Sequence, residues 1–377
     1  MRDLMARCFR RLLAPAGRDD RGAIGVVVAI FLAAGVLLGM GALVIDVGQL
    51  YQNRAELQNG ADAAALAVAK SCALGTCTSG IAPHYATANA SALTGGQAGV
   101  DMVCGSGSLG GCPASTGAMT DCPAAPSAGT NYVDVHASTR APSGSLLPPA
   151  FGRLLLGNSS YNGTNVKACA QAIWGAPSFA NTIAFTVSAC SWYAYTSNGT
   201  SFAQPPPYPP NTAPTASQDH ILYEHGTKNA TTGGCPLDNQ SGADAPGNFG
   251  WTNDTGNCST SISNGSYGGQ TGVPASGACK TVIANDQANR TVVYVPVYST
   301  VSGTGNNVTY TLLGFGAFVI TGYHITGSFK ADDWLNPANN CTGNLFCIDG
   351  YFTQGLIPST GGVGGTPLGV WIVELSG

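Results

Sequence analysis

Residues 23–45 read AIGVVVAIFLAAGVLLGMGALVI and contain no charged residue, proline, asparagine or glutamine. A helix rises about 1.5 Å per residue, so this run is long enough to cross the roughly 30 Å hydrocarbon core of a bilayer. We therefore predict a transmembrane helix over residues 23–45. Because the run lies close to the N-terminus, its orientation decides the compartment in which the rest of the chain folds.

The charges on the two sides of this run predict its orientation. Six arginines and three aspartates precede it, a balance of +3, whereas residues 46–377 carry 16 acidic and nine basic residues, a balance of −7. Basic residues beside a membrane helix stay on the cytoplasmic side. We expect a single-pass protein of the cell membrane, with residues 1–22 as a cytoplasmic tail and the C-terminal domain extracytoplasmic.

A cleaved signal peptide is the alternative interpretation of the N-terminus, because signal peptides also begin with basic residues. Their apolar core is usually about 7–15 residues long, which is shorter than the run at 23–45. The length favours a retained anchor, and both interpretations export the remainder of the chain.

The distribution of the thirteen cysteines agrees with export. Cys8 alone precedes the apolar run, and an even set of twelve follows it, as disulfide pairing in an oxidising compartment would produce. The best local pairs are Cys72 with Cys77 and Cys341 with Cys347. No C-x2-C pair occurs and the five histidines are scattered, so a zinc site is not favoured. The disulfide candidates are Cys72, Cys77, Cys104, Cys112, Cys122, Cys169, Cys190, Cys235, Cys258, Cys279, Cys341 and Cys347.

A helical stalk is predicted to follow the membrane run, over residues 46–93. Apolar residues recur at near-helical spacing in 46–70, and alanine, the best helix former, is abundant in 61–69. A second, shorter helix is predicted over Pro83–Leu93. The residues on the predicted apolar face are Leu50, Leu57, Ala61, Ala64, Ala65 and Val68.

The rest of the chain, residues 94–377, predicts a β-rich exported domain. Residues 94–130 are rich in Gly, Ser and Ala with three cysteines, and we interpret them as a bridged loop. Residues 204–215 form a Pro-rich loop, and Gly314 and Gly316 are expected to bend a run that is too long for one strand. The predicted fold class is α+β, with a long N-terminal transmembrane and stalk helix before a disulfide-rich, mainly β domain. Strands are predicted at 131–139, 165–174, 182–195, 291–301, 307–326 and 369–375.

The order of motifs around the apolar run resembles a known family. Arg21-Gly22-Ala23, the apolar run, an IDVGQLY segment and an RAELQNGADAAALA segment resemble the N-terminal domain of TadG-like proteins, which belong to the Flp (tight adherence) pilus machinery of bacteria. The resemblance covers about residues 21–70, with looser similarity at Val133–Pro177, Pro246–Trp251 and Val293–Gly322. The residues that carry the motif are Arg21, Gly22, Asp46, Gly48, Tyr51, Arg54, Leu57, Gln58, Asn59, Ala61, Asp62, Ala65 and Leu66.

This resemblance implies a membrane-anchored, pilin-like protein that acts in pilus assembly, adhesion or secretion, with no catalytic residues. One feature of related pilins is missing, because the fifth residue after Gly22 is Val27 where they carry a glutamate. Longer relatives can carry a D-x-S-x-S metal-dependent adhesion motif, which this sequence lacks. We therefore expect no metal site, no cofactor and no enzymatic activity.

Three further features bear on partners. Gly35 and Gly39 form a small-xxx-small pattern that would let two membrane helices approach closely, although glycine is also common in unpartnered membrane helices. Asp62 is either a paired charge within an assembly or part of a solvated helix face. The expected partners are the lipid bilayer and either other Tad/Flp pilus components or a second copy through the stalk helices. Nucleic acid is excluded because the exported part carries too few basic residues.

The alternative function is a single-pass surface adhesin or ligand-binding protein without a pilus role. Its candidate contacts are aromatic residues, although core packing explains most of them more simply. The nearest polar constellation, Asp219-His220 with Glu224-His225, lacks a third partner for metal binding or catalysis. The aromatic candidates are Trp192, Tyr193, Tyr195, Trp251 and Trp334.

Overall fold

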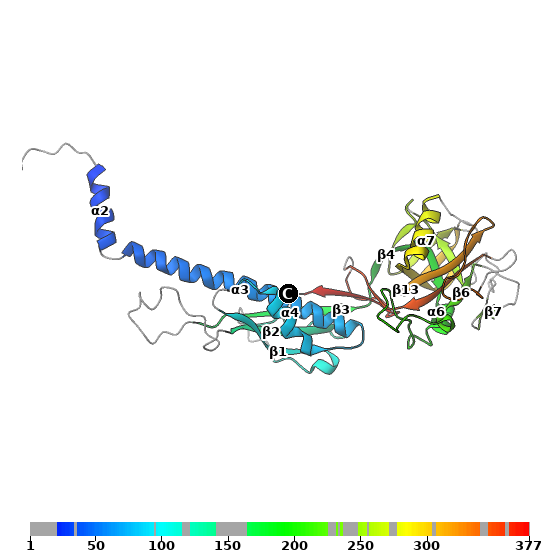
Figure 1. Ribbon diagram of the computed structural model, residues 1–377, viewed down its shortest axis with the longest axis horizontal. Coiled ribbons are helices and arrows are strands. Elements are labelled where there is room, and N and C mark those ends of the chain that lie inside the picture. Colours follow the sequence, from blue (N-terminus) through cyan, green and yellow to red (C-terminus); the bar gives the residue numbers. More distant parts are fainter. Residues whose placement is uncertain are drawn as a thin grey trace, which may run out of the picture.

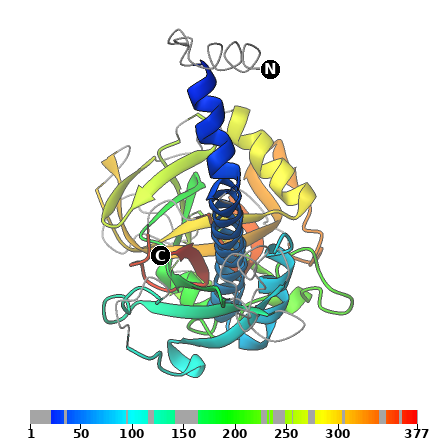
Figure 2. The same ribbon diagram turned by 90° about the vertical axis from the view of Figure 1, so that its left-hand side faces the viewer.

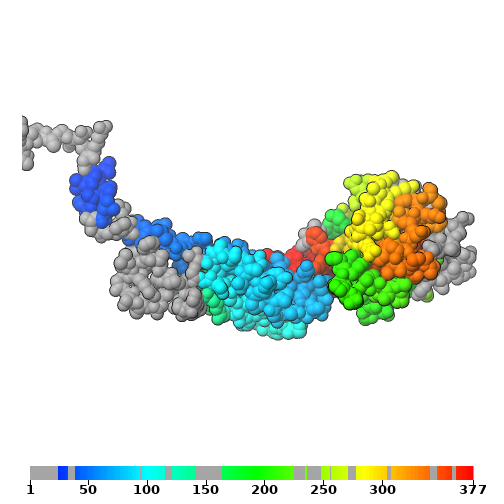
Figure 3. All heavy atoms as spheres, viewed as in Figure 1, coloured from blue at the N-terminus to red at the C-terminus, as the bar shows by residue number. Residues whose placement is uncertain are grey.

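The protein is elongated, with a narrow helical arm at one end, a helix–sheet module in the middle and a β-rich head at the far end (Figure 1, Figure 3). This computed structural model covers the 377-residue chain. The residues that it describes are 21–33, 36–93, 96–114, 121–140, 164–224, 231–232, 234–236, 248–254, 256–270, 277–303, 307–339, 346–358 and 362–376.

Two helices form the arm. They are α2 (Arg21–Ala33) and α3 (Val36–Ala73), and residues 34 and 35 between them lie outside the described part. The two helices point in different directions (Figure 1), so the apolar run is not seen as the one continuous helix that its length predicted. The length of an apolar run predicts how far a helix could extend, but it does not predict where the helix changes direction. Among the described residues, no helix combines the length and the apolar character needed to cross a membrane.

The helix–sheet module consists of α3 from Asn53 onward, α4 (Ala82–Asn89) and a five-stranded sheet of order β1-β2-β3-β17-β16. Figure 2, seen from the arm end, shows β1 and β2 on one side of α3. Neighbouring strands are antiparallel except β16 and β17, which are parallel. The last strand, β17, returns from the head to pair with β3. The strands are β1 (Gln97–Gly105), β2 (Asn131–Arg140), β3 (Lys167–Gly175), β16 (Gly355–Leu356) and β17 (Val370–Leu375).

Small side chains allow α3 to lie close to this sheet. The predicted apolar face is buried from Leu57 to Val68 and packs on Val133, Val135 and the alanines of β3, whereas Leu50 is half-buried. Val133, Val135 and Ala137 alternate along β2, which the sequence predicted as a strand, and they face the helix. The domain boundary predicted after residue 93 remains a prediction.

The head is built on a long sheet of order β11-β9-β5-β12-β13-β15-β6, with β14 (Phe329–Ala331) paired to β13. Because β11 also pairs with β13, the strands β11, β9, β5, β12 and β13 close into a ring, and β15 and β6 extend from it. The ring strands are β5 (Phe185–Ser188), β9 (Phe249–Thr252), β11 (Ser266–Gln270), β12 (Val292–Ser302) and β13 (Thr309–Thr326), followed by β15 (Cys347–Thr353) and β6 (His220–Tyr223).

Smaller elements complete the head. A second sheet pairs β4 (Phe179–Ile183) with β10 (Ser259–Ser263), and a short ladder pairs β7 (Thr231–Thr232) with β8 (Cys235–Pro236). The helices are α6 (Ala189–Tyr195) and α7 (Gly277–Asn289). Three short 3-10 turns occur at Ser79–Ile81, Gly107–Leu109 and Ala216–Gln218 in the described residues.

The structure departs from the sequence predictions at four elements. The predicted bridged loop at 94–130 contains strand β1. The predicted strand at 182–195 is β5 followed by helix α6, which Ser188 caps by accepting a hydrogen bond from the Ser191 amide. Helix α7 was not predicted. The run at 309–326 is one strand rather than two, with a pairing irregularity beside Gly314.

Candidate functional site

The arm presents a large apolar surface to its surroundings. Val44 is 70% exposed and Ile24 is 69% exposed, and their neighbours are exposed to similar degrees. Exposed apolar patches of this extent mark surfaces that another molecule or a membrane covers. The other large exposed apolar side chains of the arm are Val26, Val27, Val28, Ile30, Phe31, Leu32, Met40, Leu43, Ile45 and Val47.

The predicted site residues of the arm fall into three groups. Arg21 and Gly22 begin α2, and Gly35 lies outside the described residues. Gly39 and Asp46 are half-buried on α3. Gly48 and Tyr51 are exposed, and a Cβ built on Gly48 would meet nothing within 4 Å.

At Asn53 the helix passes from exposed to buried. Asn53 is only 2% exposed, and from Leu57 onward one face of α3 lies in the core of the helix–sheet module. Of the motif residues, Leu57, Ala61 and Ala65 are fully buried on this face. Arg54 is half-buried, Asn59 is exposed and Leu66 packs at the edge of the core. The family-like motif therefore covers both the exposed arm and the helix face that holds the sheet.

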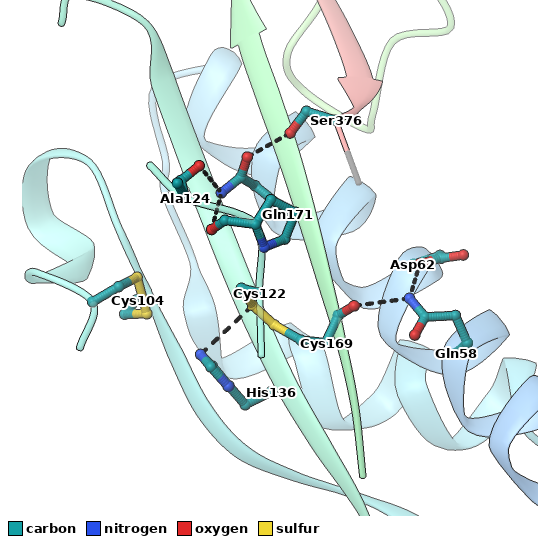
Figure 4. Close-up of a disulfide and its surroundings, with 11 residues drawn as sticks. Gln58, Asp62, Cys104, Cys122, Ala124, His136, Cys169, Gln171 and Ser376 are labelled. Carbon is teal, nitrogen blue, oxygen red and sulfur yellow. Dashed lines mark hydrogen bonds between the residues drawn. A yellow bond between two sulfur atoms is a disulfide. The ribbon is translucent and has the colours of Figure 1, made fainter. Parts of the chain in front are cut away.

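Gln58 joins this helix to the sheet. Its Nε2 donates to Asp62 Oδ1 at 2.8 Å and to the carbonyl oxygen of Cys169 at 2.9 Å (Figure 4). Asp62 is half-buried, and its partner is one turn away on the same helix. Cys169 lies on β3, so this hydrogen bond links a defined position of α3 to a defined position of the strand.

Gly60 marks the closest approach of α4 to α3. A Cβ built on Gly60 would lie 2.6 Å from the Ala86 carbonyl oxygen and 3.0 Å from the Ala90 side chain. No other residue type leaves this space, so the glycine permits the two helices to touch. No local pattern in the sequence predicts this contact, because the proximity of α4 is a tertiary feature.

A disulfide cluster lies on the sheet face opposite α3. Cys122 is bonded to Cys169 on β3, and Cys104 at the end of β1 to Cys112. A separate bridge, Cys72 to Cys77, lies at the end of α3. Gln171 donates to the Pro123 and Ala124 carbonyl oxygens and accepts from Ser376 Oγ at 2.7 Å (Figure 4). These links tie the Cys122 loop and the C-terminal strand to the middle of the sheet.

His136 lies among these sulfur atoms, with its Nε2 3.6 Å from Cys122 Sγ. It forms two groups of possible metal ligands with atoms within 4.8 Å, one with Cys122 and Cys169 and one with Cys104 and Asp134. The cysteines are disulfide-bonded and offer no thiolate for a metal. Burial raises the pKa of the nearby Asp134 carboxyl. The cysteines of this cluster therefore serve as disulfide cross-links of the sheet.

The head has its own disulfides. Cys190 is bonded to Cys235, and Cys258 to Cys279. Cys347 is also disulfide-bonded, and its predicted partner Cys341 lies outside the described residues. Each of these five disulfides joins two cysteines of the helix–sheet module or two cysteines of the head. In the described residues, the two parts are connected by β16, β17 and the chain leading to β4, and no disulfide is seen to cross between them.

The other sequence candidates in the head do not assemble into a site. Trp192 and Trp251 are core residues at 2% and 1% exposure, so they offer no contact surface to a ligand. His220 stacks on Tyr195 with ring centroids 4.1 Å apart, and His225 lies outside the described residues.

A hollow of about 350 Å³ lies where the arm meets the helix–sheet module. It combines apolar side chains of α3 with the basic residues Arg54 and Lys167. The lining residues are Val47, Leu50, Tyr51, Arg54, Thr164, Asn165, Val166 and Lys167.

Comparison with known protein families gives a match at the N-terminal end of the chain. A family model described as putative Flp pilus-assembly TadE/G-like matches residues 22–71, which are α2, the intervening residues and nearly all of α3. This confirms the resemblance inferred from the motif order. Neither the curated proteins nor the solved structures include a match to the chain. The comparison supports involvement in Flp pilus assembly and a location in the cell envelope.

Proposed function

We propose that this protein is a membrane-anchored, pilin-like structural or assembly component of a Flp (Tad) pilus or a related surface secretion system. The observation that carries the proposal is the exposure of large apolar side chains along α2 and the first part of α3, within the segment that matches the family. A pilus component needs such a surface twice, first to reside in the membrane and then to pack beside neighbouring subunits.

The charge distribution supports one orientation of this anchor. The basic N-terminal tail, residues 1–22, would remain in the cytoplasm, and the acidic remainder would lie outside. The disulfides of the helix–sheet module and the head fit an oxidising compartment. The first part of α3 would then carry the chain from the bilayer to the sheet.

The partners follow from the same surface. Lipid would cover the exposed apolar side chains before assembly, and helices of other pilus components or of second copies would cover them afterwards. Arg54 and Lys167, beside the hollow at the base of the arm, would lie near the membrane surface and its phosphate groups. No catalytic step is part of this proposal.

The test replaces the native gene in its bacterial host with a Leu32→Asp variant. Leu32 is 49% exposed in the arm, and an aspartate near the centre of an inserted helix costs about 2.5–3.5 kcal/mol. We expect the variant to leave the membrane fraction and the host to lose surface pili. The matched control is Ala55→Asp, which places the same charge on an exposed position of α3 beyond Asp46.

Two results would count against the proposal. Normal pili in the Leu32→Asp strain would show that the arm is not an anchor. A gene deletion that abolishes adherence but leaves pilus number and length unchanged would favour the alternative, a surface adhesin without a pilus role.

A further inference from the structure

The hollow at the base of the arm lies where α3 passes from the arm onto the sheet (Figure 1). Its lining residues at positions 47, 50, 51 and 54 recur at three- and four-residue spacing, so they form one face of the helix. Toward the N-terminus this face continues through Leu43 and Val44, which are 60% and 70% exposed, and toward the C-terminus through the buried Leu57. One continuous helix face therefore leads from the apolar arm through the hollow into the core.

The other wall of the hollow is the segment of residues 164–167, which enters β3. The Thr139 hydroxyl accepts a hydrogen bond from the Val166 amide at 3.2 Å and donates to Asn165 Oδ1 at 3.3 Å. The Thr139 amide donates to the Val166 carbonyl oxygen at 3.0 Å. These bonds hold the segment to the end of β2, so the sheet itself fixes this wall.

The lining of the hollow carries positive charge. Its eight lining residues include Arg54, which is half-buried, and Lys167, which is exposed at the rim, and none of the eight is acidic. On the same helix, Asp46 is eight residues from Arg54, about 12 Å along the axis. Glu56 is two residues from Arg54, about 200° around the helix. The hollow therefore favours an anionic ligand.

The position of the hollow along α3 matches the headgroup layer of a bilayer that residues 23–45 would span. Val47 lies about 3 Å and Arg54 about 13–14 Å beyond Ile45 along the helix axis. A headgroup layer extends about 5–7 Å beyond the hydrocarbon core. Because a helical side chain leans toward the N-terminus of its helix, the long Arg54 side chain is directed back toward that layer. Tyr51, which is 72% exposed, is of a type enriched at membrane interfaces.

We propose that this hollow binds the phosphate group of an anionic phospholipid from the extracytoplasmic leaflet. The planar guanidinium of Arg54 would donate to two phosphate oxygens, and Lys167 would add a second positive charge from the rim. Val47 and Leu50 would contact the first carbons of the acyl chains. The inference rests on the proposed function, because only an anchored arm brings the hollow to a bilayer.

A phospholipid fits the hollow better than a free phosphate ion does. The volume of about 350 Å³ is within the range of about 300–1,000 Å³ that ligand pockets occupy, and a lone phosphate ion would leave most of it unfilled. The lining is apolar at Val47, nearer the membrane run, and cationic at Arg54, farther from it. A phospholipid presents its acyl chains and its phosphate in the same order.

The test measures lipid binding to the full-length protein, purified free of lipid in a neutral detergent. Thermal unfolding is followed while phosphatidylglycerol, which is anionic, or phosphatidylcholine with the same acyl chains, which is neutral, is added. A ligand that binds the folded state raises the Tm. We expect phosphatidylglycerol to raise the Tm in a saturable manner, phosphatidylcholine to have a much smaller effect, and inorganic phosphate at the same concentration to have none.

Three single variants identify the site. Arg54→Gln and Lys167→Gln should each raise the phosphatidylglycerol concentration at half-maximal effect by roughly fivefold, the contribution of one basic residue near an anionic surface. The matched control, Lys70→Gln, removes the same charge from the exposed end of α3 and should bind as the wild type does. If Arg54→Gln lowers the Tm without lipid, Lys167→Gln at its exposed position gives the same comparison.

Two results would overturn the proposal. One is an equal rise in Tm with both lipids, and the other is an unchanged phosphatidylglycerol response in the double variant Arg54→Gln/Lys167→Gln. A full response to inorganic phosphate would also contradict it, because the ligand would then be a free anion. The anchor is tested separately, since both hollow variants should stay in the membrane fraction that Leu32→Asp is expected to leave.

Discussion

Gln58 and Cys169 are joined by a 2.9 Å hydrogen bond from the Gln58 side-chain amide to the Cys169 backbone carbonyl. The bond links the family-like helix to the strand that carries the Cys122 disulfide (Figure 4). Together with the apolar packing of α3 on β2 and β3, this hydrogen bond holds the helix against the sheet.

Removing this link should loosen the helix from its sheet. Gln58→Ala deletes the donor to Cys169 and leaves Asp62 without its partner, so we expect a loss of about 1–2 kcal/mol in the free energy of unfolding. Thermal unfolding of the full-length protein in detergent measures the effect. Asn59→Ala, at the exposed neighbouring position, should change stability by less than about 0.5 kcal/mol. Equal effects at the two positions would show that the Gln58 bond contributes nothing specific.

Two glycines of the same helix should respond to alanine in opposite directions. Gly60→Ala places a methyl group 2.6 Å from the Ala86 carbonyl oxygen, so α4 must move and stability should fall by about 1–3 kcal/mol. Gly48→Ala meets nothing within 4 Å and should be neutral or stabilising by up to about 1 kcal/mol, because alanine favours helix. The two unfolding temperatures compared side by side check this. A stabilising Gly60→Ala would mean that α4 does not pack on α3.

Two buried aspartates of the head, Asp219 and Asp349, should make stability depend on pH. The pKa of Asp219 is raised to about 8 and that of Asp349 to about 7, above their values in the unfolded chain, so the folded state holds protons that unfolding releases. This contribution is complete below the unfolded pKa of about 4 and is lost as the pH rises through the folded values. The Tm should therefore fall as the pH rises from about 7 to about 8 and level off above that.

The pH window is chosen to avoid His220. Burial lowers the pKa of His220, which adds a destabilising charge below neutral pH and opposes the aspartate trend there. Burial raises the pKa of Tyr351, so its phenol group stays neutral across the window. The slope should be smaller in Asp349→Asn and unchanged in Asp332→Asn, which changes an exposed aspartate. A Tm that rises with pH across this window would contradict the assigned protonation states.

Some of this architecture follows from sequence periodicity. The buried face of α3 from Leu57 to Val68 was predicted because helical spacing alone places those side chains together. The composition of residues 131–139 likewise predicted the strand that is β2. Such local patterns require no knowledge of distant parts of the chain.

Other features depend on contacts between distant residues. Nothing near β17 indicates that the last strand pairs with β3, and nothing near Gly60 indicates that α4 touches it. Asp219, Asp333 and Asp349 are buried in the head and come from segments far apart in the chain, so no local motif predicts their burial. Helix α6 was read as strand because its aromatic residues favour strands, and the capping role of Ser188 was missed.

The most direct test of the anchored, exported arrangement uses Cys8, in the N-terminal tail. Intact spheroplasts are treated with a membrane-impermeant maleimide, with Cys8→Ser identifying the labelled thiol. Ala288→Cys, at an exposed position of α7, serves as the external reference. Our account predicts that Ala288→Cys is labelled at once and that Cys8 is labelled only after the membrane is permeabilised. Labelling of Cys8 in intact spheroplasts, or protection of both positions, would contradict the account.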